Sequence, residues 1–354
     1  MIFETFNNLL YSMAKNDTFN KIAAFDLDNT IIKTISGKKI PIDKNDWVFN
    51  FSNVKEILYN YYNQCYKIII FTNQPEISTN KINKNDFIDK INNIHQELNI
   101  EFDIFISTDL DYFRKPMSGM WDFFIEKYGI FIDKKNSFYC GNIFDHKNDI
   151  NYINIRFAYN IGLHINIPEN IFEKKNLNIP KDEYINLSFP KQKNTIKPKK
   201  EREMIILVGK PNSGKTEFTY NFTENYKNYI GINLDDKLYK KKIKDAFINK
   251  NSIILDSTNS TKKSRNKYIE LAKKNNIFNV RIIVFDISTS LAKHINHYRA
   301  QLNHTNILSN SVYHNFDKTY EEPTLNEGVY SIEKITFSFT EKLNNKIFNY
   351  HFDI

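Results

Sequence analysis

The sequence has few of the residues that stabilise small secreted domains, and it has no long apolar run. Its two cysteines, Cys65 and Cys140, are too few for a disulfide framework or for a thiolate zinc site. No stretch approaches the roughly 18 apolar residues that a membrane span needs, and the opening segment lacks the basic and apolar regions of a secretion signal. We therefore expect a protein of the cytoplasm or the nucleus, with no membrane partner.

Length and composition indicate a folded protein of two domains. The 354 residues exceed what one hydrophobic core usually organises, and 41% of them are apolar while 25% are charged. The segment KQKNTIKPKK is polar and basic and follows Pro190, which is typical of a linker. We therefore predict a first domain over residues 1–190, a basic linker over 191–203 and a second domain over 204–354.

The positive charge is concentrated in the second half of the chain. Residues 1–190 carry 21 basic and 24 acidic side chains, whereas residues 191–354 carry 28 and 17, and the net charge is +8. A basic second half favours a polyanionic partner such as nucleic acid. Coding bias toward lysine is the alternative explanation, because the chain is also rich in Asn, Ile and Tyr.

Short apolar runs alternate with longer stretches of helical periodicity in both halves. This alternation is typical of an α/β fold in which each mostly parallel sheet is covered by helices. In such sheets ligands bind at the carboxyl ends of the strands, so the residues that follow each run are candidates for chemistry. The expected strands are 21–25, 66–71, 103–107 and 137–140 in the first half, and 204–208, 229–233, 252–256 and 280–285 in the second.

The first expected strand ends in the sequence DLDNT, which begins at Asp26. Residues i and i+2 leave a strand on the same face, so Asp26 and Asp28 can face one bound group. Paired carboxylates at a strand end suit phosphoryl chemistry, in which one attacks phosphorus and the other transfers protons. A solvated turn is the alternative explanation for this motif taken alone.

Two later strand ends carry groups that can bind phosphate. The second expected strand is followed by Thr72 and Asn73, where a hydroxyl and backbone N–H groups can hold an anion. Beyond the third expected strand, Lys115 supplies a cation. Thr72 can also cap a helix, and Lys115 can be a surface charge. Their order at successive strand ends favours a phosphatase site.

The second half opens with a phosphate-binding loop. Its first expected strand leads into a GxxxxGK[ST] motif, in the strand–loop–helix context that this motif requires. The glycines allow backbone N–H groups to face phosphates, Lys215 can reach the β and γ phosphates, and the Thr216 hydroxyl can bind magnesium. The motif predicts ATP binding by Gly209, Lys210, Pro211, Asn212, Ser213, Gly214, Lys215 and Thr216.

Carboxylates follow the next two expected strands of this half. Asp235 can take a proton from an incoming hydroxyl, or it can cap a helix together with Asp236. Asp256 ends the following strand and precedes a basic helix, whose alternative explanation is a solvated amphipathic face.

The motifs of the first half, FDLDNT, FTNQ, FRKPMSGMWDFF and CGN, resemble those of the haloacid dehalogenase-type phosphatases. They are narrower than that superfamily and look like the 3'-phosphatase domain of the polynucleotide kinase 3'-phosphatase family. The resemblance implies Asp26 as nucleophile, Asp28 as general acid/base, and Thr72 and Lys115 as phosphate ligands. It also implies magnesium held by the Asp26 carboxylate and the Asp28 carbonyl.

The fourth motif departs from this family pattern. Relatives usually have Gly-Asp after the last strand, where this chain has Asn142, and the acid expected a dozen residues later is Asn154. Magnesium prefers charged oxygen ligands, so we expect these amides to weaken metal binding unless Asp145 or Asp149 reaches the site. The candidate metal ligands are Asp26, Asp28, Asn142, Asp145 and, in the second half, Thr216.

The order of P-loop, NLDD, ILDSTN and a later helix with His and Arg resembles the kinase domain of the same family. The sequence EEPTLNEG near the C-terminus is similar to that family's C-terminal signature. The resemblance implies Asp235 as general base, Asp256 as an acid that orients acceptor groups, and residues 293–299 as a lid. Arg299 is then the main candidate for stabilising the transferring charge, and His297 would support it in a pH-dependent way.

The resemblance covers nearly the whole chain and implies a bifunctional end-healing enzyme that uses ATP and magnesium. It would remove a 3'-phosphate and phosphorylate a 5'-hydroxyl of nucleic acid, and the order of the domains favours DNA over RNA. A 5'-kinase whose phosphatase half is impaired by Asn142 and Asn154 is the alternative. A non-catalytic module that binds strand ends and a small-molecule kinase fused to a phosphatase also stay open, and the oligomeric state is not predicted.

Overall fold

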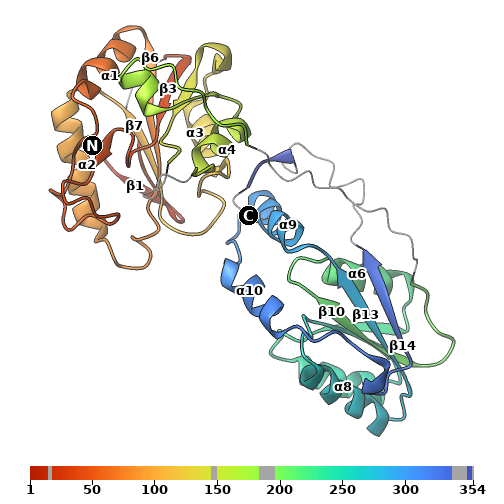
Figure 1. Cartoon of the computed structure of the whole chain (residues 1–354). Coiled ribbons are helices and arrows are strands. Elements are labelled where there is room, and N and C mark those ends of the chain that lie inside the picture. Colours follow the sequence, from red (N-terminus) through yellow and green to blue (C-terminus); the bar gives the residue numbers. More distant parts are fainter. Residues whose placement is uncertain (15–17, 145–149, 183–195, 337–348, 353–354) are drawn as a thin grey trace. The chain divides into compact units, whose positions relative to one another are not determined.

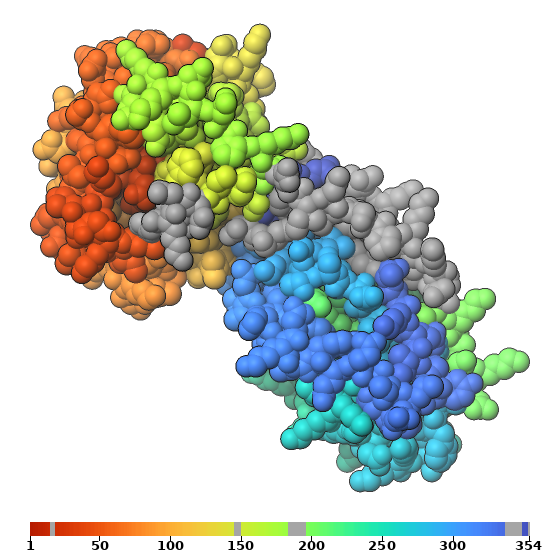
Figure 2. Space-filling model, in the orientation of Figure 1, coloured from red at the N-terminus to blue at the C-terminus, as the bar shows by residue number. Residues whose placement is uncertain are grey.

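The computed structural model describes residues 1–14, 18–144, 150–182, 196–336 and 349–352. The chain divides into two compact units, which Figure 1 shows as ribbons and Figure 2 as surfaces. The first unit comprises Met1–Ile185, His297–Ile307 and Lys346–Ile354, and the second comprises Asn186–Asn296 and Leu308–Asn345. This division differs from the predicted one chiefly because His297–Ile307 group with the first unit.

Contacts far apart in the sequence explain this difference. The backbone N–H of Ser118 donates to Oε1 of Gln301 at 3.0 Å. The ring of Tyr112 stacks on His304, with the ring centroids 4.2 Å apart. Both partners of each pair belong to the first unit. Local sequence carries no signal for such contacts, so the segment could not be assigned before the fold was known.

The first unit is built on a seven-stranded sheet. Its strands in spatial order are β1 (Glu4–Phe6), β2 (Leu9–Ser12), β7 (Asp103–Ser107), β6 (Tyr66–Asn73), β3 (Lys21–Phe25), β8 (Phe138–Cys140) and β9 (His164–Asn166). The strands from β7 to β9 are parallel, and β1 and β2 extend the sheet in antiparallel fashion. A separate antiparallel pair is formed by β4 (Ile32–Lys33) and β5 (Val48–Phe49).

Helices cover both faces of this sheet (Figure 1). On one face lie α1 (Val54–Asn63) and α2 (Lys84–Leu98), and on the other lie α3 (Gly119–Tyr128) and α4 (Ile153–Ile161). The short α5 (Pro168–Phe172) and the 3-10 turn η1 (Lys134–Asn136) complete the unit. Because both faces are covered, the central strands are buried except at their ends and contain apolar runs rather than alternation.

Local sequence explains where α2 begins and which face it buries. The side chain of Asn83 accepts hydrogen bonds from the backbone N–H groups of Asn85 and Asp86, the second and third residues of the helix, as an N-cap does. Apolar side chains then recur at helical spacing from Phe87 to Leu98 and pack into the core against β3, β6 and β7. On the opposite face the ring of Phe71 packs against Phe124 and Phe157.

The second unit is built on a five-stranded sheet that is parallel throughout. Its strands in spatial order are β11 (Tyr229–Asn233), β12 (Ser252–Asp256), β10 (Glu203–Gly209), β13 (Asn279–Asp286) and β14 (Ser331–Thr336). Its helices are α6 (Lys215–Asn225), α7 (Tyr239–Ile248), α8 (Lys262–Lys274), α10 (Asn310–Thr319) and the first part of α9 (Thr289–Asn303), and it contains the 3-10 turn η2 (Leu325–Glu327). Two apolar clusters on opposite faces of the sheet form its core.

The EEPTLNEG segment is anchored in this unit by a buried ion pair. Arg265 donates from Nε and Nη2 to the carboxylate of Glu327 at 2.8 and 2.7 Å, and both side chains are at most 1% exposed. Nη1 of Arg265 donates to the backbone carbonyls of Asn259 and Ser260, which follow β12. The ion pair therefore ties the predicted signature segment to the loop at the end of β12.

The fold-class prediction is confirmed, because both units contain mostly parallel sheets covered by helices. All eight expected strands are present, with ends shifted by at most two residues. The strands β1, β2, β9 and β14 and the short pair of β4 and β5 were not expected. Within the described ranges, no helix combines the length and the apolar character that crossing a bilayer requires.

Candidate active sites

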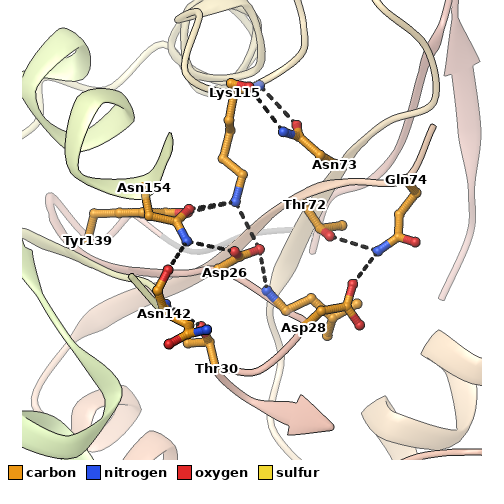
Figure 3. A network of polar contacts seen from close by, with 11 residues as sticks. Asp26, Asp28, Thr30, Thr72, Asn73, Gln74, Lys115, Tyr139, Asn142 and Asn154 are labelled. Atoms are coloured by element: carbon orange, nitrogen blue, oxygen red, sulfur yellow. Dashed lines mark hydrogen bonds and ion pairs between the residues drawn. The ribbon is translucent and has the colours of Figure 1, made fainter. Parts of the chain in front are cut away.

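The first candidate site lies at the carboxyl end of β3, in the centre of the first sheet (Figure 3). The backbone N–H of Asp26 donates to the carbonyl of Cys140 in β8 at 2.8 Å, and this bond fixes the start of the loop. Leu27 is 0% exposed and packs in the core, so its two acidic neighbours line a cavity of about 280 Å³. The prediction that Asp26 and Asp28 face one site is in agreement with this geometry.

Lys115 reaches Asp26 from the loop between β7 and α3. Asn73, at the end of β6, holds this loop: its Nδ2 donates to the carbonyl of Lys115 at 3.1 Å, and its Oδ1 accepts from the N–H of Lys115 at 2.9 Å. Nζ of Lys115 lies 2.8 Å from Oδ1 of Asp26, and the lysine is 2% exposed. Burial lowers the pKa of Lys115, whereas the neighbouring negative charge of Asp26 opposes that shift.

Asn154, from α4, is hydrogen-bonded to Asp26 and to three groups beside it (Figure 3). Its Nδ2 donates to Oδ2 of Asp26 at 2.9 Å and to the backbone carbonyl of Asn142 at 2.7 Å. Its Oδ1 accepts from Nζ of Lys115 at 3.0 Å and from the hydroxyl of Tyr139 at 2.7 Å. Both N–H groups and both lone pairs of the amide are therefore satisfied.

Asp28 lies on the other side of the cavity with Gln74 and Thr72. Nε2 of Gln74 donates to Oδ2 of Asp28 at 2.6 Å and to Oγ1 of Thr72 at 3.0 Å. Burial is the largest influence on the pKa of Asp28 and raises it, and the charge of Asp26 raises it further. The charge of Lys90 and the hydrogen bond from Gln74 lower the pKa but do not reverse the upward shift. Gln74 entered the sequence analysis only as the last residue of the FTNQ motif and was given no role, and Tyr139 was not identified, because a tyrosine inside a buried strand carries no signal for chemistry.

Oxygen ligands for magnesium are present at this site. The carboxylates of Asp26 and Asp28 and the amide of Asn142 line the cavity, and magnesium is commonly bound through one or two carboxylates together with a substrate phosphate. This donor set fits the ion. Asn154 is fully engaged in hydrogen bonds and offers no ligand in this arrangement. Asp145, the remaining candidate in this half, lies outside the described residues.

The second candidate site lies at the carboxyl end of β10. The loop from Gly209 to Gly214 connects this strand to α6, which begins at Lys215. Gly214 has φ of 93°, a conformation that favours glycine. Nζ of Lys215 donates to the backbone carbonyls of Gly209 and Lys210 at 3.0 and 2.6 Å and to Oγ of Ser213 at 3.2 Å. The loop therefore surrounds the ammonium group of Lys215.

The adjoining strand β12 places Asp256 at the same loop. Oγ1 of Thr216 donates to Oδ2 of Asp256 at 2.7 Å, and Asp256 is 5% exposed. Burial lowers the pKa of Lys215 to about 8, while the charges of Asp256 and Asp235 oppose this shift. The two residue types that P-loop magnesium sites employ, a hydroxyl and a carboxylate, are therefore in contact.

Residues from α10 support the same loop and were not identified from the sequence. Nδ2 of Asn212 donates to the hydroxyl of Tyr313 at 2.7 Å. Nζ of Lys210 lies 2.9 Å from Oδ1 of Asp317. Pro211 lies between these two anchored residues. The loop conformation is therefore held from α10 as well as by its own lysine.

The two acids after β11 differ in their contacts. Asp236 accepts a hydrogen bond from the N–H of Leu238 at 2.8 Å and pairs with Lys242, so it stabilises the turn before α7. The N-cap of α7 is Leu238, and no side chain among the described residues caps the helix. Asp235 is exposed, and within the described part of the chain its carboxylate makes no hydrogen bond or ion pair. Asp235 therefore stays a candidate general base.

The predicted lid residues are divided between the two units. Lys293 belongs to the second unit, whereas His297 and Arg299 belong to the first. The ring of His297 is buried and stacks on Phe352, with the centroids 5.5 Å apart, and Arg299 is exposed. The roles of His297 and Arg299 in phosphate transfer stay predictions.

Comparisons with known proteins match the first unit to a family model and most of the chain to bifunctional relatives. Residues 21–172 match the family model described as polynucleotide kinase 3 phosphatase. The chain is 30% identical over 327 residues to the bifunctional polynucleotide phosphatase/kinase of Schizosaccharomyces pombe, covering 90% of this chain and 80% of that protein. It is 29% identical over 373 residues to a protein of Acanthamoeba polyphaga mimivirus, covering 91% and 86%. The polynucleotide 3'-phosphatase ZDP of Arabidopsis thaliana is 32% identical over 186 residues, which cover 48% of this chain and 26% of that protein.

Proposed function

This chain belongs to the bifunctional polynucleotide phosphatase/kinase family, and we propose that it heals both ends of a strand break. The first unit removes a 3'-phosphate, and the second transfers the γ-phosphate of ATP to a 5'-hydroxyl. The observation that carries this proposal is that one chain contains two separate phosphate-handling sites. One is the pair of Asp26 with Lys115, and the other is the P-loop with Thr216 bonded to Asp256.

In the proposed phosphatase reaction, Asp26 attacks the phosphorus of the terminal phosphate. The bond between phosphorus and the 3'-oxygen breaks, and Asp28 gives its proton to that oxygen as it leaves. Burial raises the pKa of Asp28, which favours the protonated acid at the start of the reaction. Asp28 then takes a proton from water, whose oxygen attacks the phosphoaspartate and releases inorganic phosphate.

The other residues of the first site bind and orient the reacting groups. Lys115 neutralises charge on the phosphate and on Asp26, and Asn154 fixes the orientation of the Asp26 carboxylate through Oδ2. The side-chain amide of Gln74 donates to both Asp28 and Thr72 and so keeps these two side chains close together. Magnesium, when bound by Asp26, Asp28 and Asn142, would stabilise negative charge on the phosphate oxygens.

In the proposed kinase reaction, Asp235 takes the proton of the 5'-hydroxyl as its oxygen attacks the γ-phosphorus. The bond to the β-phosphate oxygen breaks, and ADP leaves. Lys215 exchanges its contacts with backbone carbonyls for contacts with the phosphates of ATP. Asp256 orients Thr216, and Arg299 stabilises the transferring charge as a lid residue.

DNA is the substrate that we propose, because the phosphatase-then-kinase order resembles that of DNA end-repair enzymes. The basic excess of residues 191–354 supports a polyanionic substrate of either kind. Parallel assays with DNA and RNA strands of one sequence separate the two. Faster conversion of the RNA ends would overturn this part of the proposal.

One experiment tests both activities on the same molecule. An oligonucleotide with a 5'-hydroxyl and a 3'-phosphate is incubated with the protein, ATP and magnesium, and the mass of each end is measured. We expect both ends to convert, with Asp26→Asn abolishing only the 3' step and Lys215→Ala only the 5' step. Conversion of the 5' end alone by the wild-type protein would instead support a kinase with an impaired phosphatase, as Asn142 and Asn154 suggest.

A further inference from the structure

Four lysines are almost completely buried within the described ranges of the chain, and three of them have anionic or polar partners. Lys67 is paired with Asp103 at 3.1 Å. Lys115 and Lys215 make the contacts described above, and both are candidates for binding phosphate. Lys90, in the middle of α2, is 3% exposed, yet it makes no hydrogen bond or ion pair with any described residue. The centroid of the Phe87 ring lies 5.1 Å from its Nζ.

The ammonium of Lys90 has no acceptor among the described residues, and its Nζ is not among the fully buried unpartnered atoms, so its aliphatic stem is buried while its charged end keeps access to solvent. Lys90 lies on the apolar stripe of α2, between Phe87 and Ile94, where a Leu or Ile would pack without a charge. The packing of the helix does not explain the charge, and within the described residues the negative group that it acts on is Asp28, with which it makes no ion pair. A site that binds an anion explains it, since the anion supplies the missing partner.

Lys90 lines a second cavity of about 300 Å³ beside the catalytic one. Pro41 and Ile82 line both cavities, so the two are neighbours along one wall of the first unit. The second cavity also contains Asn83 and Lys81. A strand whose end is held at Asp26 therefore has a short route past Pro41 and Ile82 to Lys90.

Among the described residues that line this cavity, Lys90 is the buried cation that makes no hydrogen bond or ion pair, and its charge also acts on the nearby Asp28. Lys44 is paired with Asp89 at 2.8 Å, and both side chains are largely exposed. Two carboxylates, Asp43 and Asp86, also line the cavity; Oδ1 of Asp43 accepts from the N–H of Asn45. They lie on exposed loop and helix surface and do not pair with Lys90.

We propose that Lys90 and its cavity form a second phosphate subsite, which binds the phosphodiester next to the 3'-terminal phosphate. The proposal rests on the proposed phosphatase function and adds a reason for a polynucleotide substrate. A small phosphate ester fills only the catalytic cavity, whereas a strand places one further negative charge within reach of Lys90. The subsite would distinguish strand ends from small phosphate esters.

Three substrates test this proposal by hydrolysis. The first is a 3'-phosphorylated oligodeoxynucleotide, the second is the same strand with an uncharged methylphosphonate at the linkage next to the terminal nucleotide, and the third is thymidine 3'-monophosphate. We expect Lys90→Met to raise KM for the first substrate about tenfold, the worth of one charge-assisted hydrogen bond. The KM values for the other two substrates should change less than twofold.

Lys84→Met is the matched control, because Lys84 lies on the same helix, is exposed, and is hydrogen-bonded to Thr5 rather than to this cavity. This variant should leave all three KM values unchanged. Equal losses on all three substrates in Lys90→Met would overturn the proposal, since they would mean that Lys90 acts on Asp28 or on folding. Unchanged values on all three would overturn it as well.

Binding measurements separate failure of this inference from failure of the proposed function. The Asp26→Asn protein is titrated with the charged strand and with the methylphosphonate strand, each with a 5'-phosphate and a fluorescent label. The subsite predicts weaker binding of the methylphosphonate strand, and loss of that difference when Lys90→Met is added. If the wild-type protein hydrolyses none of the substrates, the proposed phosphatase function fails. The two titrations still decide whether Lys90 binds the phosphodiester.

Discussion

Replacement of Asn154 by aspartate restores the acid that the family pattern expects, and we predict that it destabilises the protein without magnesium. The change removes both N–H donors of the amide. One of them donates to Asp26 at 2.9 Å and the other to the carbonyl of Asn142 at 2.7 Å. Hydrogen bonds to charged groups contribute about 1.5–3 kcal/mol and neutral ones about 0.5–1.5 kcal/mol. The loss of these two bonds is the first part of the cost.

The second part of the cost is electrostatic. Two carboxylates about 4 Å apart repel by about 4 kcal/mol at an effective dielectric constant of about 20. A new charge at 154 gains an attraction of similar size to Lys115, whose Nζ lies 3.0 Å from Oδ1 of the present amide. These two terms largely cancel, so we expect the free energy of unfolding to fall by about 2–4 kcal/mol, chiefly through the lost hydrogen bonds.

Magnesium should reverse this loss, because the added carboxylate increases the negative charge around the ion. The measurement is thermal unfolding of Asn154→Asp in EDTA and across a magnesium titration. Asn160→Asp is the matched control: Nδ2 of Asn160 donates to the carbonyls of Pro116 and His351, each at 2.8 Å, away from Asp26. Both variants should be destabilised in EDTA, and only Asn154→Asp should be rescued. Wild-type stability of Asn154→Asp in EDTA would refute this reasoning.

Three further predictions follow from the same contacts. Asn142→Asp should raise phosphatase activity at limiting magnesium, because it adds a charged ligand; an unchanged magnesium requirement would contradict this. Nucleotide affinity should not change with pH below pH 8 and should fall up to tenfold per pH unit above pH 8. The reason is that Lys215 has a pKa of about 8 without ligand and must be protonated to bind phosphates. Nucleotide titrations that show constant affinity up to pH 10 would contradict this prediction. Arg265→Met should lower the free energy of unfolding by about 3–5 kcal/mol in denaturant titrations, because it removes the cation that neutralises the buried Glu327 and leaves this carboxylate with the N–H of Thr324. A loss below 1 kcal/mol would show that the pair is dispensable.

The strand ends were predictable because two independent signals coincide there. Apolar runs identify the buried strands, and polar residues directly after them identify the edge where ligands bind. Asp26, Thr72 and Asp256 all follow from this rule. Lys90 could have been noticed, because a lysine among the apolar positions of α2 conflicts with helical periodicity. Without the fold, a solvated lysine at the rim of the stripe explains it equally well.

Other features depend on tertiary contacts that no local pattern contains. The grouping of His297–Ile307 with the first unit rests on contacts such as the one between Ser118 and Gln301. Tyr139 lies inside a buried strand, where an aromatic residue needs no functional explanation. Its hydroxyl becomes informative only once Asn154 is seen to accept its hydrogen bond.

Asn142 and Asn154 look equivalent in the sequence, since each stands where relatives have an acid, but they differ in the structure. Asn154 is buried, and its amide makes four hydrogen bonds that hold Asp26 and Lys115 together. The side chain of Asn142 is partly exposed, and among the described residues it is bonded only to the backbone of Phe144. An acid at 142 can therefore add a ligand without removing a contact to the nucleophile, whereas an acid at 154 removes one. An amide at 154 consequently does more than remove charge, because it keeps the proposed nucleophile oriented when magnesium is scarce.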